Sequence, residues 1–336
     1  MANTKQILAL MHSRAEGDDA QFESIVLQVA ASEARKGHRK IAEELRKAVA
    51  SARSKRSNSS SVTVPFAAPR GDLDGLLELR KVSTKLSDVI LSEKVSERLG
   101  TVLLQQRKRD WLREHAKTPN RHLLFVGPPG AGKTMTAGAL AGELNLPFYI
   151  IRLEAIMTRY MGETAAKLRL IFNETLKRRA VYFFDEFDAI GARRNSTNDV
   201  AEMRRVLNSF LMFLEEPSST DSLIVGATNH SEILDLALIR RFDDVLEFSL
   251  PSASEIKSVI KSHIRPMKYP KFQWKKVVDT AQGLSQAEIA RATEEAVKMA
   301  ILNESNSVSD EGLIEKLSER QGMKSAFKGT REVSNN

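Results

Sequence analysis

The chain has 336 residues and a mass of 37.5 kDa, which allows one large domain with smaller attachments. Hydrophobic residues make up 42% and charged residues 28% of it, a globular balance that excludes a fibrous or largely disordered chain. The absence of cysteine excludes disulfides and thiolate chemistry, and no apolar run approaches the roughly 20 residues that cross a bilayer. We therefore expect a cytoplasmic protein without a membrane partner. Its net charge of +8 leaves nucleic acid open as a less favoured partner.

The N-terminal part is patterned as short helices. Apolar residues within 25–29, and again within 41–49, fall at the offsets that place side chains on one face of a helix. Residues 51–61 are rich in serine and basic side chains and contain almost nothing apolar, which is typical of a linker. We predict a helical module over residues 1–54 that binds a partner or substrate, followed by a linker over 55–72. The alternative is that this module packs permanently on the rest of the chain.

The remainder alternates between short apolar runs and helical segments. A charged, helix-prone stretch covers residues 82–120, and after Pro251 the pattern is helical to about residue 325. Such alternation predicts an α/β domain, with a parallel sheet covered by helices on both faces. We assign this domain to residues 73–250, a helical lid subdomain to 251–325 and a tail to 326–336. The predicted buried strands are residues 122–126, 148–151, 181–184 and 223–227.

A phosphate-binding loop, or P-loop, lies between the first of these strands and the following helix. Glycines let consecutive backbone N–H groups turn toward an anion, and a helix N-terminus adds a favourable dipole. Lys133 would reach the terminal phosphates of a nucleotide, and Thr134 would offer its hydroxyl to Mg²⁺. The matching residues are Gly127, Pro128, Pro129, Gly130, Ala131, Gly132, Lys133 and Thr134.

Two acids follow the third predicted strand. Asp185 and Glu186 stand at its C-terminal end, which is where ligands bind in open α/β sheets. Asp185 is the expected second ligand of Mg²⁺, and Glu186 would polarise the attacking water. The alternative is an acidic strand end that only caps the next helix, the role that we assign to Asp188.

Five further segments, which the last sentence of this paragraph lists, match a known family in their order and spacing. Over residues 88–320 the chain resembles the AAA subfamily of the AAA+ ATPases. The resemblance implies a P-loop domain with a helical lid, in which Asn229 orients the water or senses the terminal phosphate. It also implies that Arg240 and Arg241 act in the neighbouring subunit's site, and their adjacency is similar to the branch of katanin and spastin. The alternatives are a turn residue at Asn229 and surface charges at the arginines. The segments are Tyr160-Met161-Gly162-Glu163, Asp185-Glu186, Ala227-Thr228-Asn229, Leu234-Asp235 and Arg240-Arg241-Phe242-Asp243.

The same resemblance implies a substrate channel and differences at the nucleotide base. Tyr160, Met161 and Gly162 match the loop that grips an extended peptide in the central channel of a hexamer, unless Tyr160 simply packs locally. Residues 199–205 would form a second channel loop and the start of its helix. The family's Gly-Phe-Ser-Gly-Ala pattern is Gly283-Leu284-Ser285-Gln286-Ala287 here, and segment 88–90 lacks the glycines usual beside adenine. We therefore expect altered base contacts.

These features together predict an ATPase that uses ATP and Mg²⁺. The resemblance implies a homo-oligomer, a hexamer, that hydrolyses ATP at its subunit interfaces and threads a protein substrate through its channel. The chain contains neither His-Glu-x-x-His nor Gly-x-Ser-x-Gly, so any proteolysis would need a separate protease partner, as in some bacterial stand-alone members that it resembles. The alternatives are a DNA-associated AAA+ motor or loader, favoured by the positive charge, and a non-catalytic ATP switch. Glu186 and the paired arginines argue against the switch.

Overall fold

The structure is a computed structural model. It describes residues 71–156, 163–187, 197–218, 220–230, 239–265, 267–269 and 272–333, with Val26, Ala30, His38, Glu43 and Lys47. The chain divides into two compact units, Met1–Thr63 and Val64–Asn336.

The first unit is described only at isolated positions. Val26 and Ala30 are helical and buried, whereas Glu43 and Lys47 are helical, exposed and joined by an ion pair of 3.5 Å. Most of the predicted N-terminal helices and residues 51–61 lie outside the described residues. The division of the N-terminal part into module and linker therefore stays a prediction.

In the part of the second unit that the structure describes, six strands form one sheet in the order β1-β3-β4-β5-β2-β6. All of them run parallel except β1, which pairs antiparallel with β3. The α/β prediction is confirmed, and β5 ends one residue later than expected. The strands are β1 (Leu77–Arg80), β2 (His122–Val126), β3 (Phe148–Ile151), β4 (Val181–Phe184), β5 (Leu223–Thr228) and β6 (Asp244–Glu247).

The edge strands β1 and β6 were not predicted, and β1 adds an antiparallel edge to the predicted parallel sheet. β1 has the sequence Leu-Glu-Leu-Arg and β6 the sequence Asp-Val-Leu-Glu, so neither is an apolar run. An edge strand has a neighbour on one side only, and charged residues are common there because they discourage further pairing. Their register depends on partners far away in the sequence.

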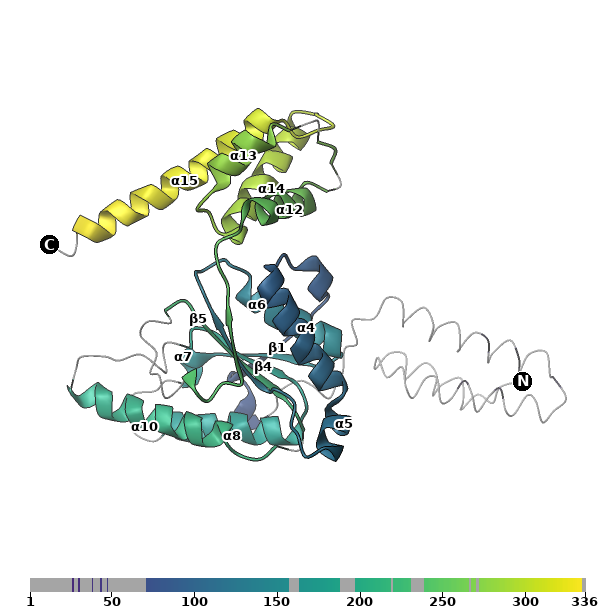
Figure 1. The fold of residues 1–336 in the computed structure, drawn as a ribbon, viewed down its shortest axis with the longest axis vertical. Coiled ribbons are helices and arrows are strands. Elements are labelled where there is room, and N and C mark those ends of the chain that lie inside the picture. Colours follow the sequence, from purple (N-terminus) through teal and green to yellow (C-terminus); the bar gives the residue numbers. More distant parts are fainter. Residues whose placement is uncertain are drawn as a thin grey trace, which may run out of the picture. The chain divides into compact units, whose positions relative to one another are not determined.

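Helices cover both faces of the sheet (Figure 1). α4 (Glu93–Arg107) and α6 (Lys133–Leu144) pack on one face, and α8 (Glu163–Lys177) and α10 (Thr197–Leu214) pack on the other. Side chains of β4 alternate between the two hydrophobic cores, so this strand is buried on both faces and reads as an unbroken apolar run. The shorter helices are η1 (Gly71–Leu73), η2 (Leu86–Asp88), α5 (Arg109–Glu114) and α7 (Leu153–Ile156).

The C-terminal lid is helical and has its own hydrophobic core. Capping boxes start two of its helices, at Ser252 with Glu255 and at Ser285 with Glu288. The last helix continues beyond residue 325, into the segment predicted as a tail. No helix among the described residues is long and apolar enough to cross a lipid bilayer. The lid helices are α12 (Ala253–Ile264), α13 (Trp274–Ala281), α14 (Gln286–Leu302) and α15 (Asp310–Val333).

Candidate active site

The strand order brings the P-loop, the two acids and Asn229 to one edge of the sheet. β5 lies between β4 and β2, with Val126 opposite Thr228 and Phe184 opposite Gly226. Because these strands are parallel, the P-loop after β2, the two acids after β4 and Asn229 after β5 emerge side by side.

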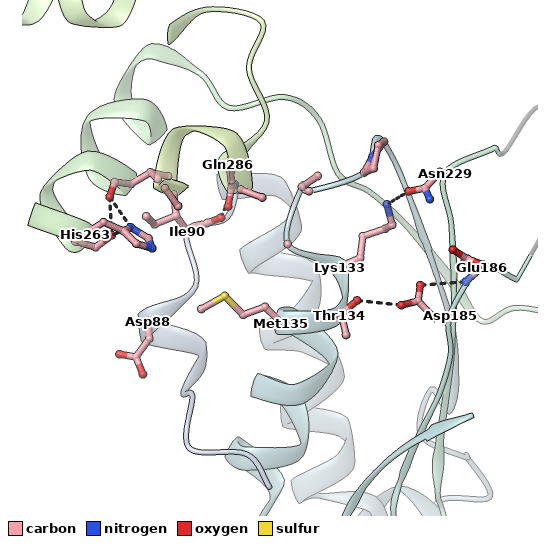
Figure 2. Close-up of a pocket in the computed structure, with 18 residues that line it drawn as sticks. Asp88, Ile90, Lys133, Thr134, Met135, Asp185, Glu186, Asn229, His263 and Gln286 are labelled. Carbon is pink, nitrogen blue, oxygen red and sulfur yellow. Dashed lines mark hydrogen bonds between the residues drawn. The ribbon is translucent and has the colours of Figure 1, made fainter. Parts of the chain in front are cut away.

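A cavity of about 450 Å³ opens at this edge and is lined on its other side by residues of the lid (Figure 2). This volume lies within the usual range for small-ligand sites. Residues 129–134, Asp185, Glu186 and Asn229 line one end of the cavity. The other end is more apolar and is formed by Asp88, Ile90, Met135, Val259, Ser262, His263, Gln286, Ala287 and Ala290.

The P-loop conformation depends on its glycines. Gly127 has a φ of 147°, and a Cβ at this position would lie 2.0 Å from the carbonyl oxygen of Phe248, so no other residue fits there. Gly132 has a φ of 93° and forms the N-cap of α6. The helix therefore begins at Lys133, and its N-terminus lies at the cavity.

Lys133 is buried, and its ammonium group contacts oxygen atoms from both sides of the site. Nζ donates hydrogen bonds to the carbonyl oxygens of Gly127 (2.6 Å) and Pro128 (3.0 Å) and to Oδ1 of Asn229 (2.7 Å). These acceptors offset the cost of burying a charge. Two residues that were predicted independently, 96 positions apart, are thus in direct contact.

Thr134 and Asp185 also meet. The hydroxyl of Thr134 donates to Oδ2 of Asp185 over 3.4 Å, and Oδ1 of Asp185 accepts from the backbone N–H of Glu186 at 3.0 Å (Figure 2). Hydroxyl and carboxylate oxygens are the hard ligands that Mg²⁺ takes, together with waters and nucleotide phosphates. The described residues contain no group of three or more acidic, His or Cys side chains that could cage a metal by themselves.

Glu186 has a left-handed backbone with a φ of 50° and an exposed side chain at the cavity. A residue with a Cβ pays roughly 1–2 kcal/mol for this conformation. Two hydrogen bonds hold it, one from its own N–H to Asp185 and one from the N–H of Phe187 to the carbonyl oxygen of Ala227 at 2.8 Å. Strain of this kind concentrates at functional sites.

Arg240 and Arg241 do not line this cavity. Both are exposed in the turn before β6, and Arg241 forms an ion pair with Glu215 at the end of α10. Asp243 anchors the turn, because its Oδ2 accepts hydrogen bonds from the backbone N–H groups of Arg121 (2.7 Å) and His122 (2.8 Å). Burial lowers the pKa of His122 to about 4, which Asp243 opposes and Arg121 reinforces.

Tyr160, Met161 and Gly162, Asp188 and the Leu234-Asp235 pair lie outside the described residues. The expectation for residues 199–205 needs correction, because α10 begins at Thr197 and the segment is helical throughout.

Sequence reasoning missed part of the more apolar end of the cavity. Met135, Val259, Ser262, His263 and Ala290 line it, although none stands in a recognisable motif. His263 lies in the last turn of α12, where the sequence around it gives no sign of a binding site. Its Nδ1 is 2.9 Å from the carbonyl oxygen of Val259. Only the packing of the lid reveals its position.

Comparisons with known proteins agree with this geometry. Residues 123–250 match the family model AAA, ATPase family associated with various cellular activities. The chain is 31% identical over 295 residues to an uncharacterized AAA family ATPase of Sinorhizobium fredii, covering 88% of each chain.

Two further relatives are longer proteins. The chain is 32% identical over 238 residues to the ATP-dependent zinc metalloprotease FtsH 3 of Sphaerobacter thermophilus, covering 69% of this chain and 48% of that protein. It is 34% identical over 233 residues to the proteasome-activating nucleotidase of Saccharolobus islandicus, covering 67% and 59%. The chain thus spans about half the length of these two relatives. Together with the P-loop site, the comparisons identify the chain as a member of the AAA family of ATPases, which binds nucleotide and hydrolyses ATP.

Proposed function

We propose that this ATPase is a motor that remodels or unfolds proteins as a homohexameric ring in the cytoplasm. It hydrolyses ATP at its subunit interfaces and draws a polypeptide through its central channel. One observation carries the proposal: the P-loop, Asp185, Glu186 and Asn229 meet in one cavity, whereas Arg240 and Arg241 lie outside it. An arginine can stabilise transition-state charge only where it reaches the phosphates. Because these two arginines stand apart from the cavity of their own chain, they are suited to the cavity of a neighbouring copy.

The geometry supports a role for each residue in hydrolysis. Lys133 exchanges its carbonyl and amide partners for phosphate oxygens, and Asn229, once released, is free to contact the terminal phosphate or the water. The carboxylate of Glu186 orients the attacking water, and its left-handed backbone fixes where this carboxylate stands. Thr134 and Asp185 would hold Mg²⁺, which would neutralise charge on the phosphates.

The names of two relatives support a protein substrate. One is a proteasome-activating nucleotidase and the other an ATP-dependent protease. Because this chain has no His-Glu-x-x-His sequence, a separate protease is a candidate partner rather than a second activity of this chain. Tyr160, Met161 and Gly162 are the proposed residues that grip the polypeptide.

An unfolding assay with a trapping variant tests the proposal. Glu186→Gln should hold ATP and substrate together, so proteins captured on it in the presence of ATP are candidate substrates. Wild type should then unfold a captured protein in an ATP-dependent manner. The measurement is the captured protein's loss of fluorescence or of protease resistance. Lys133→Ala is the control that should do neither.

A DNA-associated motor remains the second candidate because of the +8 net charge and the pI near 9.5. DNA-stimulated ATP hydrolysis, together with binding that weakens steeply with salt, would favour it. ATP-dependent unfolding without any response to DNA would favour the protein motor.

A further inference from the structure

Gln286 joins the lid to the more apolar end of the nucleotide cavity. It is the first residue of α14, and its side-chain Nε2 donates a hydrogen bond to the carbonyl oxygen of Ile90 over 2.9 Å. Its Oε1 lies 3.6 Å from the point that a Cβ on Gly132 would occupy. Figure 2 shows Gln286 reaching from the lid toward Ile90. One half-buried side chain therefore approaches two separate walls of the cavity.

The neighbouring residues make a second attachment, which needs only backbone atoms. The N–H of Ala287 donates to the carbonyl oxygen of Gly130 at 3.0 Å. The hydroxyl oxygen of Ser285 lies 2.7 Å from the position of a Cβ on Gly130, so the lid sits tightly against the P-loop. Because this contact uses the main chain, many sequences could make it. The bond from Gln286 depends on the side chain.

The two attachments hold α14 from different directions. A single hydrogen bond to Gly130 leaves the helix free to pivot about that point, whereas a second bond to Ile90 opposes the pivot. Ile90 also packs against the lid's hydrophobic core, so this apolar contact and the hydrogen bond from Gln286 together join its segment to the lid. The family pattern has a small residue at this position, which could not make the second attachment.

We propose that Gln286 is a positioning residue: its side-chain amide holds the lid against segment 88–90 and thereby sets how tightly the site retains nucleotide. Gln286 takes no part in the hydrolysis step. Figure 2 places Ile90, Asp88 and His263 on the opposite side of the cavity from Asp185, Glu186 and Asn229. The proposal rests on nucleotide binding by an AAA ATPase and is independent of the proposed protein substrate.

Gln286→Gly, measured in the full chain, separates retention from chemistry. We expect the Kd for ADP and the KM for ATP to rise about three- to tenfold, which is the contribution of one neutral hydrogen bond. The kcat at saturating ATP should stay within about twofold of wild type. Unchanged ADP affinity would overturn the proposal, and so would a large loss of kcat with KM unchanged.

Gln286→Glu gives a second readout, in which protonation restores the donor. The variant has almost the same shape, but its ionised carboxylate has no donor for Ile90, whereas its protonated form has one. Since that hydrogen bond favours the neutral form, the pKa of the new carboxyl should lie above its ordinary value. The ADP affinity of the variant, divided by that of wild type, should therefore recover as the pH falls from 8 toward 5.

Gln282→Glu is the matched control. Gln282 is exposed at the end of α13, four residues away, and does not line the cavity. The same change of charge there should leave the affinity ratio flat with pH. Asp88, Lys133, Asp185, Glu186 and His263 line the cavity in every variant, so the division by wild type removes their own titration. A deficit of Gln286→Glu that is constant with pH would contradict the proposed bond.

Discussion

Lys133 and Glu186 line the same cavity but are expected to act at different stages. Lys133→Ala should lose nucleotide binding, because the ammonium contacts the phosphates of bound ATP. Glu186→Gln should bind ATP normally but lose about 10²-fold or more in kcat, since its carboxylate acts on the water during the reaction. Calorimetric titration with ATP and a phosphate-release assay separate the two effects. Equal turnover by Glu186→Gln and wild type would refute the role of this carboxylate.

His122 makes stability depend on pH. Its pKa is lowered to about 4 in the folded chain, whereas the unfolded chain takes up the proton near 6.5. The unfolded state therefore binds more protons between these values, and stability falls as the pH drops from about 6.5 to 4, by up to about 3 kcal/mol. His122→Gln should flatten this part of the profile in urea unfolding at several pH values. An unchanged slope would mean that other groups cause it.

At the scale of the elements, aromatic side chains join α8 and α10 to β4. Phe210 is fully buried, and its ring lies 5.3 Å from those of Phe172 and Phe184. Phe210→Ala should lower the free energy of unfolding by about 3–5 kcal/mol through the cavity that it creates. Met212 on the same helix is 58% exposed, so Met212→Ala should change it by less than about 0.5 kcal/mol. Similar losses from both, in denaturant unfolding, would contradict the packing described here.

The turn that carries Arg240 and Arg241 is positioned by elements on two sides. Asp243 ties it to the start of β2, and Glu215 holds Arg241 at the end of α10. The Arg241–Glu215 pair is about half exposed, so it contributes little to stability and leaves the guanidinium free to exchange partners. This arrangement suits an arginine that changes contacts when another copy docks.

At the scale of the whole molecule, we expect these arginines to act between copies. Arg241→Ala should lose hydrolysis while keeping near-normal ATP affinity. A mixture with Lys133→Ala should recover part of the activity, because Lys133→Ala supplies arginines to a neighbour with an intact P-loop. A mixture of Lys133→Ala with Glu186→Gln is the control and should recover nothing, since every cavity in it is defective. Lack of recovery in verified mixed rings would count against action between subunits.

Residues 1–54 are predicted to recruit a partner or substrate. A chain that begins at Val64, where the second compact unit starts, should keep basal ATP hydrolysis and assembly but lose partner binding. ATPase rate, size-exclusion behaviour and partner capture measure the three properties together. If the shortened chain is insoluble or inactive as an ATPase, residues 1–63 belong to the fold of the motor instead.

Local patterns in the sequence were enough to predict the buried strands of the sheet and the phosphate-binding part of the site. The P-loop and the acids after β4 are contiguous motifs, and strands buried on both faces are unbroken apolar runs, so neither needs knowledge of distant residues. The roles of Asn229, of the arginines and of Tyr160 stay predictions. Only the tertiary structure decided the edge strands β1 and β6, the left-handed backbone of Glu186 and the contact of Lys133 with Asn229. It also decided the more apolar end of the cavity, where Gln286 donates a hydrogen bond to Ile90 across 196 positions of sequence and His263 lines the same cavity, because such neighbours depend on how the lid packs rather than on any local pattern.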